Sequence, residues 1–485
     1  MRAAAIRSTP LFSAVLFLVG AFVLYWNALK LTFLADDLVA VWRIGVRHEI
    51  PRSTFFRPLS EWSLVFNDLL SGPAPAGYRA FNVLVHGINA WLVMRFIGLL
   101  FPDTRDSGTR WIAVCSGLLF LCYPFHGEAV IWIVGRGASL ATLFTLLALS
   151  ALVRQQGRGQ AVFLTSLLFF LGMLAYETAM LFPLFAGIVL HALGADRREV
   201  VRFMRAWSVV FVVHFILRMT CTDAWADSYG AGFFQHSMAH YIISIPKVLG
   251  RLFLEPHPDA SNLIIRGAIG AVVIGSAALV FLRRTRGDTT ARSRASALAL
   301  LLLVSLVVPV MAGVSTRTSE SDRFLYMPSV FACALLAMVL GHLPWRWSRN
   351  VMAAAVMVGC VFLLMRNTRN WINASTTIED IIAEVPRPVN GRIFILGLPG
   401  EVNGAFVFRH GFHEALLLAD RDTMGIFKVD TVLFERNDAR GIPTVAFDHP
   451  NDTAFLRPGD PIVAWTGAGF TAVDRTALNE GRRGS

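Results

Sequence analysis

Leu11-Phe-Ser-Ala-Val-Leu-Phe-Leu-Val-Gly-Ala-Phe-Val-Leu24 begins an apolar run that continues to Leu29, and two adjacent carboxylates follow it in Leu34-Ala-Asp-Asp-Leu38. The run approaches the ~20 residues that a helix needs to cross a bilayer. No small-residue cleavage site closes it, so we interpret it as a retained first span. Acidic residues where a membrane meets water are energetically costly and are usually functional. The alternative is a solvated helix N-cap, because Asp is common before an apolar turn.

The composition of the whole chain is typical of a membrane protein. Of its 485 residues, 55% are hydrophobic and 16% are charged, and the mean hydropathy is +0.56. These values exclude an ordinary soluble domain. Together with 11–29, further apolar runs predict about eleven transmembrane helices. The further runs lie at 78–101, 111–125, 139–153, 161–176, 178–194, 206–220, 266–282, 295–312, 328–343 and 350–366.

Arginine placement predicts the orientation of these spans. If the N-terminus is cytoplasmic, every cytoplasmic loop is short and contains at least two arginines, as the positive-inside rule expects. These loops are Asp103–Arg110, Arg154–Gln160, Asp196–Arg205, Arg283–Arg294 and Trp345–Arg349. They account for the net charge of +11 better than a nucleic-acid partner does, because no nucleic-acid-binding motif is present. We expect a multi-pass protein of a bacterial inner membrane with a periplasmic C-terminal domain.

The chain changes character after Arg366. Asn367–Glu384 predicts a polar stalk helix, and short β-type runs separated by Gly, Pro and Asp turns follow Pro386. The β-type runs are 392–398, 405–408, 428–434, 444–447 and 462–465, and 413–419 predicts one helix. The predicted fold is an α-helical polytopic membrane domain over 1–366 and a small extracytoplasmic β or α+β domain within 367–485. We find no repeat period, which argues against a solenoid.

Polar residues near the span ends collect on the outer side of this topology. A transporter would place its ionisable residues near the midplane of the bilayer. Their position at the outer rim instead favours an enzyme that takes a lipid-borne substrate from the outer leaflet. The candidate site residues are Asp36, Asp37, Arg57, His126, Glu128, Arg136, Glu177, Arg323 and Tyr326.

The order of these motifs resembles that of polytopic glycosyltransferases of the GT-C superfamily. It is most similar to the membrane half of TMTC-type protein O-mannosyltransferases and their bacterial relatives, over roughly residues 10–375. The motifs are Leu34-Ala-Asp-Asp37, Phe56-Arg-Pro-Leu-Ser60, Phe81-Asn-Val-Leu-Val-His-Gly-Ile-Asn89, His126-Gly-Glu-Ala-Val-Ile-Trp-Ile-Val-Gly-Arg136, Ala175-Tyr-Glu-Thr178 and Asp322-Arg-Phe-Leu-Tyr-Met-Pro-Ser329. Two features depart from the family: Tyr176 stands where Lys is usual, and a small domain replaces the TPR repeats.

The resemblance implies transfer of one sugar, mannose or another hexose, from a polyprenyl-phosphate donor to an acceptor hydroxyl on the outer face. By that analogy Asp36 or Asp37 is the general base, with Asp36 favoured as the first of the pair. Arg136 and Arg323, with Arg57 third, would bind the donor phosphate. The alternative for these arginines is snorkelling to lipid headgroups.

Other residues keep two interpretations. His126 and Glu128 would bind sugar or acceptor, or form a buried polar pair between helices. Glu177 is either a site carboxylate or the partner of an arginine, and Tyr326 belongs to the Asp322–Ser329 motif. His86, with Asn82 and Asn89, is assigned to interhelical packing. No dense carboxylate or histidine cluster indicates a metal, so we expect no cofactor, although a divalent cation is compatible with the chemistry.

The expected partners are the lipid-linked donor, membrane lipid and an acceptor that is a protein, a glycan or a lipid. The runner-up function is a lipid-linked oligosaccharide ligase that moves a whole glycan. A flippase or transporter is a third interpretation, but internal symmetry and midplane charge, its usual signs, are not evident in the sequence. The sequence leaves the sugar, the carrier and the acceptor open.

Overall fold

The computed structural model describes residues 9–49, 55–101, 107–155, 159–222, 237–388, 391–428, 431–433, 444–446, 453–455 and 460–473. Two compact units divide the chain. The membrane unit consists of Met1–Lys30 and His48–Arg369, and the C-terminal unit of Leu31–Arg47 and Asn370–Ser485. The acidic segment, Leu31–Arg47, therefore packs with the end of the chain. The sequence analysis, with its domain boundary at 366/367, had placed this segment in the membrane domain.

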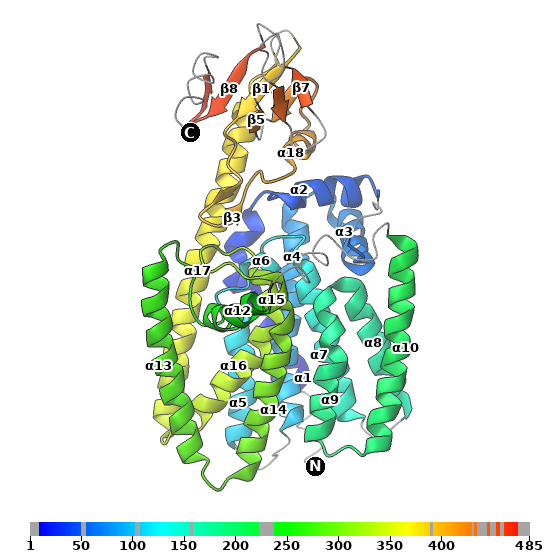
Figure 1. Ribbon diagram of the computed structural model, residues 1–485, viewed down its shortest axis with the longest axis vertical. Helices are drawn as coiled ribbons and strands as arrows, with labels where there is room; N and C mark the ends of the chain where they lie inside the picture. The colour runs from blue at the N-terminus through cyan, green and yellow to red at the C-terminus, as the bar shows by residue number, and fades with distance from the viewer. Residues whose placement is uncertain are drawn as a thin grey trace. The chain divides into compact units, whose positions relative to one another are not determined.

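Helices make up the membrane unit (Figure 1). Helix α4 packs against α1, α5 and α7, and α16 packs against α5 and α14. Most side chains of α4, α7 and α16 are buried, so the core lies among these helices. The elements are α1 (Thr9–Leu24), η1 (Trp26–Lys30), α3 (Pro58–Ser71), α4 (Pro75–Leu100), α5 (Ser107–Leu121), α6 (Gly127–Val130), α7 (Arg136–Arg154), α8 (Gly159–Ala175), η3 (Glu177–Leu181), α9 (Phe182–Ala192), α10 (Arg197–Cys221), α12 (Met238–Arg251), α13 (Ala260–Arg284), α14 (Thr289–Ser305), α15 (Val307–Ala312), η4 (Asp322–Leu325), α16 (Tyr326–Gly341) and α17 (Arg346–Glu384).

Each of the apolar runs expected from the sequence coincides with an apolar helix. Within the described residues, 7 helices are long and apolar enough to cross a membrane, and the shorter apolar helices begin at Leu11, Gly108, Gly159 and Glu177. The chain is thus a multi-pass α-helical membrane protein, as the hydropathy predicts. Helix α17 has 39 residues and is about 58 Å long. It joins the last apolar run and the expected polar stalk into one continuous helix.

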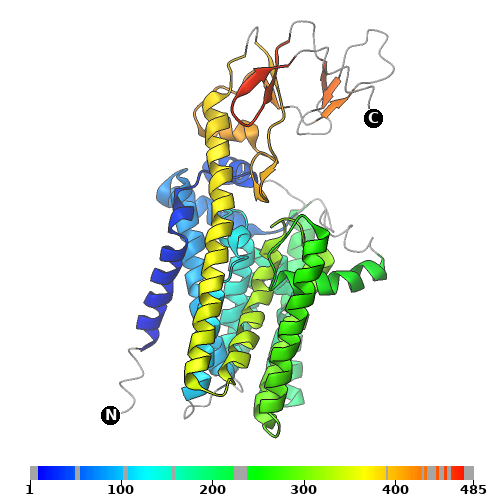
Figure 2. The same cartoon turned by 90° about the vertical axis from the view of Figure 1, so that its left-hand side faces the viewer.

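Two amphipathic helices of the membrane unit are not among the candidate spans. Helix α3 exposes Trp62, Phe66 and Leu69. Helix α12 exposes Met238 and Ile242, and it lies across the direction of the long helices in Figure 2. Exposed apolar faces on such helices suit the interface between lipid tails and headgroups. Helix α3 lies in segment 30–77 and α12 in segment 221–265, each between two predicted spans, although 223–236 lies outside the described residues.

The C-terminal unit combines helices and short sheets, so the α+β alternative is the correct one. Strand β1 is an apolar, buried run and is the parallel neighbour of both β4 and β8, as expected of a central strand. Strand β9 is antiparallel to β8, β2 pairs with β3, and β5-β6-β7 form a separate antiparallel sheet. The elements are α2 (Asp36–Ala40), the π-helical η2 (Val41–Val46), β1 (Ile393–Leu396), β2 (Glu401–Val402), β3 (Ala405–Phe406), α18 (Phe412–Leu418), β4 (Ile426–Lys428), β5 (Thr431–Leu433), β6 (Thr444–Ala446), β7 (Thr453–Phe455), β8 (Ile462–Trp465) and β9 (Phe470–Ala472).

One β-type run is divided differently from the expectation. The sequence predicts a single strand over 428–434. In the structure β4 ends at Lys428 and pairs with β1, whereas β5 begins at Thr431 and pairs with β6. The run therefore contributes to two different sheets, and Val429-Asp430 between them lies outside the described residues.

Candidate active site

Two arginines of the membrane unit converge on one tyrosine. Arg57, Glu128, Tyr176, Glu177 and Arg323 form what we call the Tyr176 cluster. They come from the start of α3, from α6, from the α8–η3 junction and from η4. Hydrogen bonds link residues that lie 120 and 195 positions apart in the chain.

Arg57 occupies one side of this cluster. Its Nε donates to both carboxylate oxygens of Glu177, at 2.9 and 3.1 Å. Its guanidinium carbon lies 4.3 Å from the centre of the Tyr176 ring and 4.4 Å from that of Phe55, which are cation–π distances. The α8–η3 junction packs closely against α3, because Ser60 Oγ donates to the carbonyl of Ala175 at 2.8 Å. Arg57 is 23% exposed and Glu177 25%, so a ligand can reach this pair.

Arg323 occupies the other side. Its Nε donates to the Tyr176 hydroxyl at 3.2 Å, and its guanidinium forms an ion pair with Glu128. The backbone N–H of Arg323 also donates to Glu128 Oε2 at 2.7 Å, and that of Ser321 to Oε1 at 3.3 Å. Ser321 has a φ of 73°, so the backbone turns sharply there and directs both amides at one carboxylate. Glu128 is therefore fixed in place, with 1% of its side chain exposed.

Glycine is required next to Glu128. A Cβ on Gly135 would lie 1.8 Å from the Glu128 carbonyl oxygen, and one on Gly137 would lie 2.9 Å from the Tyr176 ring. These two positions flank Arg136 in the chain. Close packing at both glycines explains why the sequence reads Val-Gly-Arg-Gly at the start of α7.

The other groups of the Tyr176 cluster influence the pKa of Arg57. Burial alone would lower the pKa of Arg57, but the Glu177 carboxylate and Tyr176 raise it above its usual value, while Arg323 opposes them. The two guanidinium groups thus repel each other. An anion bound by both would relieve that repulsion.

A third ion pair involves Asp322, the residue that precedes Arg323 of the Tyr176 cluster in the chain. Arg251, at the end of α12, pairs with Asp322, and their side chains are 2% and 4% exposed. The Arg251 Nε also donates to the carbonyl of Ser315 at 3.0 Å. Because both charges are buried and paired, this bridge fixes α12 to the segment that precedes Arg323.

Arg136 has different surroundings from Arg323. Its side chain is 1% exposed and donates to Ile133 O at 3.1 Å, Asn67 Oδ1 at 2.5 Å and Tyr78 O at 3.1 Å. It also contacts Ser63 at 3.2 Å. These bonds join α3, α4 and α7. The arrangement favours a structural role for Arg136, and we therefore leave it out of the proposed donor site.

His126 and Tyr326 belong to a buried polar cluster rather than to the ion pairs. His126 Nε2 lies 2.8 Å from Ser329 Oγ, and His86 Nδ1 lies 2.8 Å from the Tyr326 hydroxyl. Asn89 donates to the same hydroxyl at 3.2 Å. All five side chains are fully buried. The packing role expected for His86 fits this cluster, and it extends to His126 and Tyr326.

The acidic pair lies in the C-terminal unit. Asp36 and Asp37 form the first turn of α2, and the preceding residue, Ala35, makes the N-cap without a side-chain hydrogen bond. Asp37 is fully buried, and its Oδ2 accepts from the backbone N–H of Leu34 at 3.4 Å. Asp36 is partly exposed. The solvated N-cap interpretation is therefore wrong, and only Asp36 has the exposure that contact with a substrate needs.

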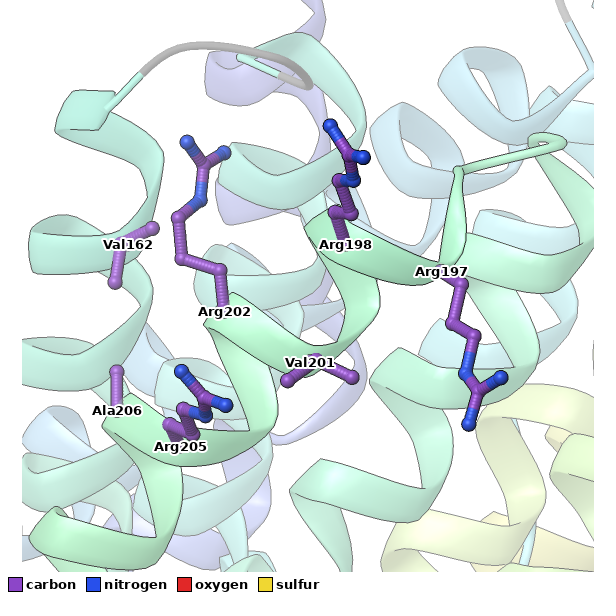
Figure 3. Close-up of a pocket in the computed structure, with 7 residues that line it drawn as sticks. All are labelled: Val162, Arg197, Arg198, Val201, Arg202, Arg205 and Ala206. Atoms are coloured by element: carbon purple, nitrogen blue, oxygen red, sulfur yellow. The ribbon is translucent and has the colours of Figure 1, made fainter.

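A separate pocket of about 730 Å³ lies at the start of α10. Arg197, Arg198, Arg202 and Arg205 line it together with Val162 of α8 (Figure 3). The four side chains are exposed, and Figure 3 shows their guanidinium groups pointing in different directions. This is the pattern of a positively charged helix start near lipid headgroups rather than of a built binding site.

No group of three or more His, Cys, Asp or Glu residues is placed to hold a metal ion within the described part of the chain. Tyr176 is the site residue that sequence reasoning missed. Its only signal was that it replaces a usual lysine in the motif Ala175-Tyr-Glu-Thr178.

Comparison with known proteins agrees with the motif resemblance. No family model matches the chain. It is 31% identical over 202 residues to the protein O-mannosyl-transferase Tmtc1 of Drosophila melanogaster, which covers 37% of this chain and 23% of the relative. It is 27% identical over 161 residues to human protein O-mannosyl-transferase TMTC3, covering 29% of this chain and 17% of the relative. The chain thus spans less than a quarter of the length of these relatives.

Among solved structures, the chain has a TM-score of 0.38 and 13% identity to ArnT from Cupriavidus metallidurans bound to undecaprenyl phosphate, covering 87% of this chain and 86% of that one. The sequence matches are the informative ones. They confirm that this multi-pass chain is similar to the TMTC-type protein O-mannosyl-transferases.

Proposed function

We propose that this chain is an integral-membrane glycosyltransferase of the GT-C type. It transfers a single hexose from a polyprenyl-phosphate donor to an acceptor hydroxyl on the extracytoplasmic face of a bacterial inner membrane. The similarity to O-mannosyl-transferases supports the reaction class and favours mannose. The observation that carries the donor class is the convergence of Arg57 and Arg323 on Tyr176.

In the proposed reaction, Asp36 removes the proton from the acceptor hydroxyl as its oxygen attacks the anomeric carbon of the sugar. A carbon–oxygen bond forms to the acceptor, and the bond from the anomeric carbon to the phosphate oxygen breaks. The phosphate leaves with the electron pair, as a polyprenyl phosphate with one more negative charge. Arg57 and Arg323 stabilise that charge.

The two glutamates of the Tyr176 cluster orient its two arginines. Each holds one arginine in a fixed orientation before the donor arrives, which lowers the entropy lost when the phosphate binds. Arg57 and Arg323 are partly exposed, and a leaving phosphate is a stronger attraction for them than a neutral sugar hydroxyl. Glu128, fully buried and bound by two amides, orients Arg323 and does not act as the base.

The test uses the purified full-length protein in nanodiscs and a radiolabelled polyprenyl-phosphate mannose. We expect release of unlabelled polyprenyl phosphate and transfer of label to an acceptor from the envelope of the source cell. A polyprenyl-phosphate glucose in a parallel reaction defines the sugar. Use of a polyprenyl-pyrophosphate oligosaccharide, with no use of either single-sugar donor, would replace this proposal with the ligase.

A further inference from the structure

The turn that carries Asp36 and Asp37 is bound by one short stretch of the C-terminal unit. We call this stretch, Ala405–Gly411, the clamp. The backbone N–H of Ala35 donates to the carbonyl of Val407 at 3.0 Å, and the N–H of Val407 donates to the carbonyl of Gly400 at 3.0 Å. Val407 therefore joins the acidic segment to the β2–β3 hairpin.

The turn itself has an unfavourable backbone conformation. Ala35 has φ 46° and ψ −118°, values close to the second position of a type II′ turn, where glycine is normally required. The turn is closed by the N–H of Asp37, which donates to the Leu34 carbonyl at 3.0 Å. A residue with a side chain keeps such a conformation only where its surroundings enforce it.

The clamp packs directly on this turn. A Cβ at Gly411 would lie 2.8 Å from the Leu38 Cβ and 3.0 Å from the Ala35 carbonyl oxygen. Leu34, Ala35 and Leu38 are at most 2% exposed. The contact is therefore dry and leaves no room for a side chain at position 411.

Two further contacts hold the flanks of the acidic segment. On its N-terminal side, the N–H of Thr32 donates to Ser375 Oγ of α17 at 2.9 Å. On its C-terminal side, Arg43 forms an ion pair with Glu414 of α18 at 3.3 Å. The segment is thus held by the C-terminal unit before, at and after the carboxylates.

We propose that the C-terminal unit is a positioning element for catalysis, and that Val407 and Gly411 are positioning residues that keep the Asp36 turn in its strained form. This inference rests on the proposed function, in which Asp36 is the base. The C-terminal unit then acts on the turnover step, and donor binding by Arg57 and Arg323 is left unchanged.

Two glycine variants test this proposal in the full-length protein. Gly411 and Gly467 have φ values of 86° and 90°, so alanine introduces similar backbone strain at both. Only Gly411 contacts the acidic segment, because a Cβ at Gly467 meets nothing within 4 Å. Gly467→Ala is therefore a matched control for Gly411→Ala. The measurements are kcat and donor KM, together with hydrogen exchange of the peptide that contains the Ala35 amide.

For Gly411→Ala we expect faster exchange at Ala35 and a fall in kcat of about 10²-fold, the cost typical of a small misplacement, with donor KM unchanged. Gly467→Ala should match the unaltered protein in all three measurements. If Gly411→Ala leaves exchange or kcat unaltered while Asp36→Asn is inactive, the clamp proposal is overturned and the proposed function stands. If Asp36→Asn is fully active, the proposed base is wrong, and the positioning role falls with it.

Discussion

Asp36 and Asp37 are neighbours in the chain, but their side chains have different surroundings. Asp36 is partly exposed, whereas Asp37 is fully buried and accepts a hydrogen bond from Leu34. General-base catalysis typically contributes ~10²–10⁴-fold, so Asp36→Asn should lower kcat by that factor and leave the melting temperature unchanged. Asp37→Asn should mainly lower the melting temperature. Near-normal turnover of Asp36→Asn would move the search for the base to Glu177.

Glu61 gives a residue-scale prediction of pH dependence. Burial raises the pKa of Glu61 to about 7, although Arg57 acts to lower it. A carboxyl whose pKa is raised on folding stabilises the folded state below its unfolded pKa, and this contribution is lost as the pH rises towards 7. Glu61→Gln should therefore flatten the pH dependence of thermal unfolding between about pH 4.5 and 7. An unchanged slope in the variant would show that Glu61 titrates normally.

At the scale of the elements, the start of α3, α6, the α8–η3 junction and η4 together build the Tyr176 cluster. We therefore expect the effects of substituting its two arginines to be coupled. Lysine offers a point charge in place of a planar fork, and hydrogen bonds to charged groups contribute about 1.5–3 kcal/mol. Arg57→Lys and Arg323→Lys should each raise donor KM on the order of 10-fold. Because both residues contact Tyr176, the double variant should depart from additivity.

Arg136→Lys should behave differently from Arg57→Lys and Arg323→Lys. Arg136 joins α3, α4 and α7 through hydrogen bonds to Ser63, Asn67 and Tyr78, and lysine would leave several of these buried groups without a donor. Each costs about 1–3 kcal/mol, so the melting temperature should fall while donor KM stays constant. A raised donor KM at unchanged melting temperature would return Arg136 to the donor site.

At the scale of the whole molecule, arginine placement predicts which loops face the cytoplasm. Two exposed positions test it in a background where the exposed Cys221 is replaced by serine. Gly400 is exposed with open space around it, and Thr290 is exposed in the α13–α14 region. A membrane-impermeant thiol reagent added to intact cells should label Gly400→Cys and not Thr290→Cys. Labelling of the second alone would invert the topology.

Most of the architecture could be predicted from hydropathy, because hydropathy patterns depend on consecutive residues. The apolar runs, the stalk within α17, most strands and the helix near His413 all follow from local patterns. The side-chain pairings in the candidate site do not follow from local patterns. Glu128 and Arg323 are 195 positions apart, and Arg43 and Glu414 are 371 apart. Arg136 and Arg323 look equivalent in sequence, and only their surroundings distinguish the buried Arg136 from the partly exposed Arg323.

The backbone conformation of Ala35 determines which residue chirality is favoured at this position. The mirror image of φ 46° and ψ −118° is an ordinary extended conformation, so the backbone at this position would suit a D-residue and is held against the preference of an L-residue. Glycine, which is achiral, accepts either. A saturation library at position 35 selected for activity should therefore return glycine and alanine and reject valine and isoleucine, whose branched side chains resist positive φ. D-alanine placed there by chemical ligation should fold at least as readily as the natural chain.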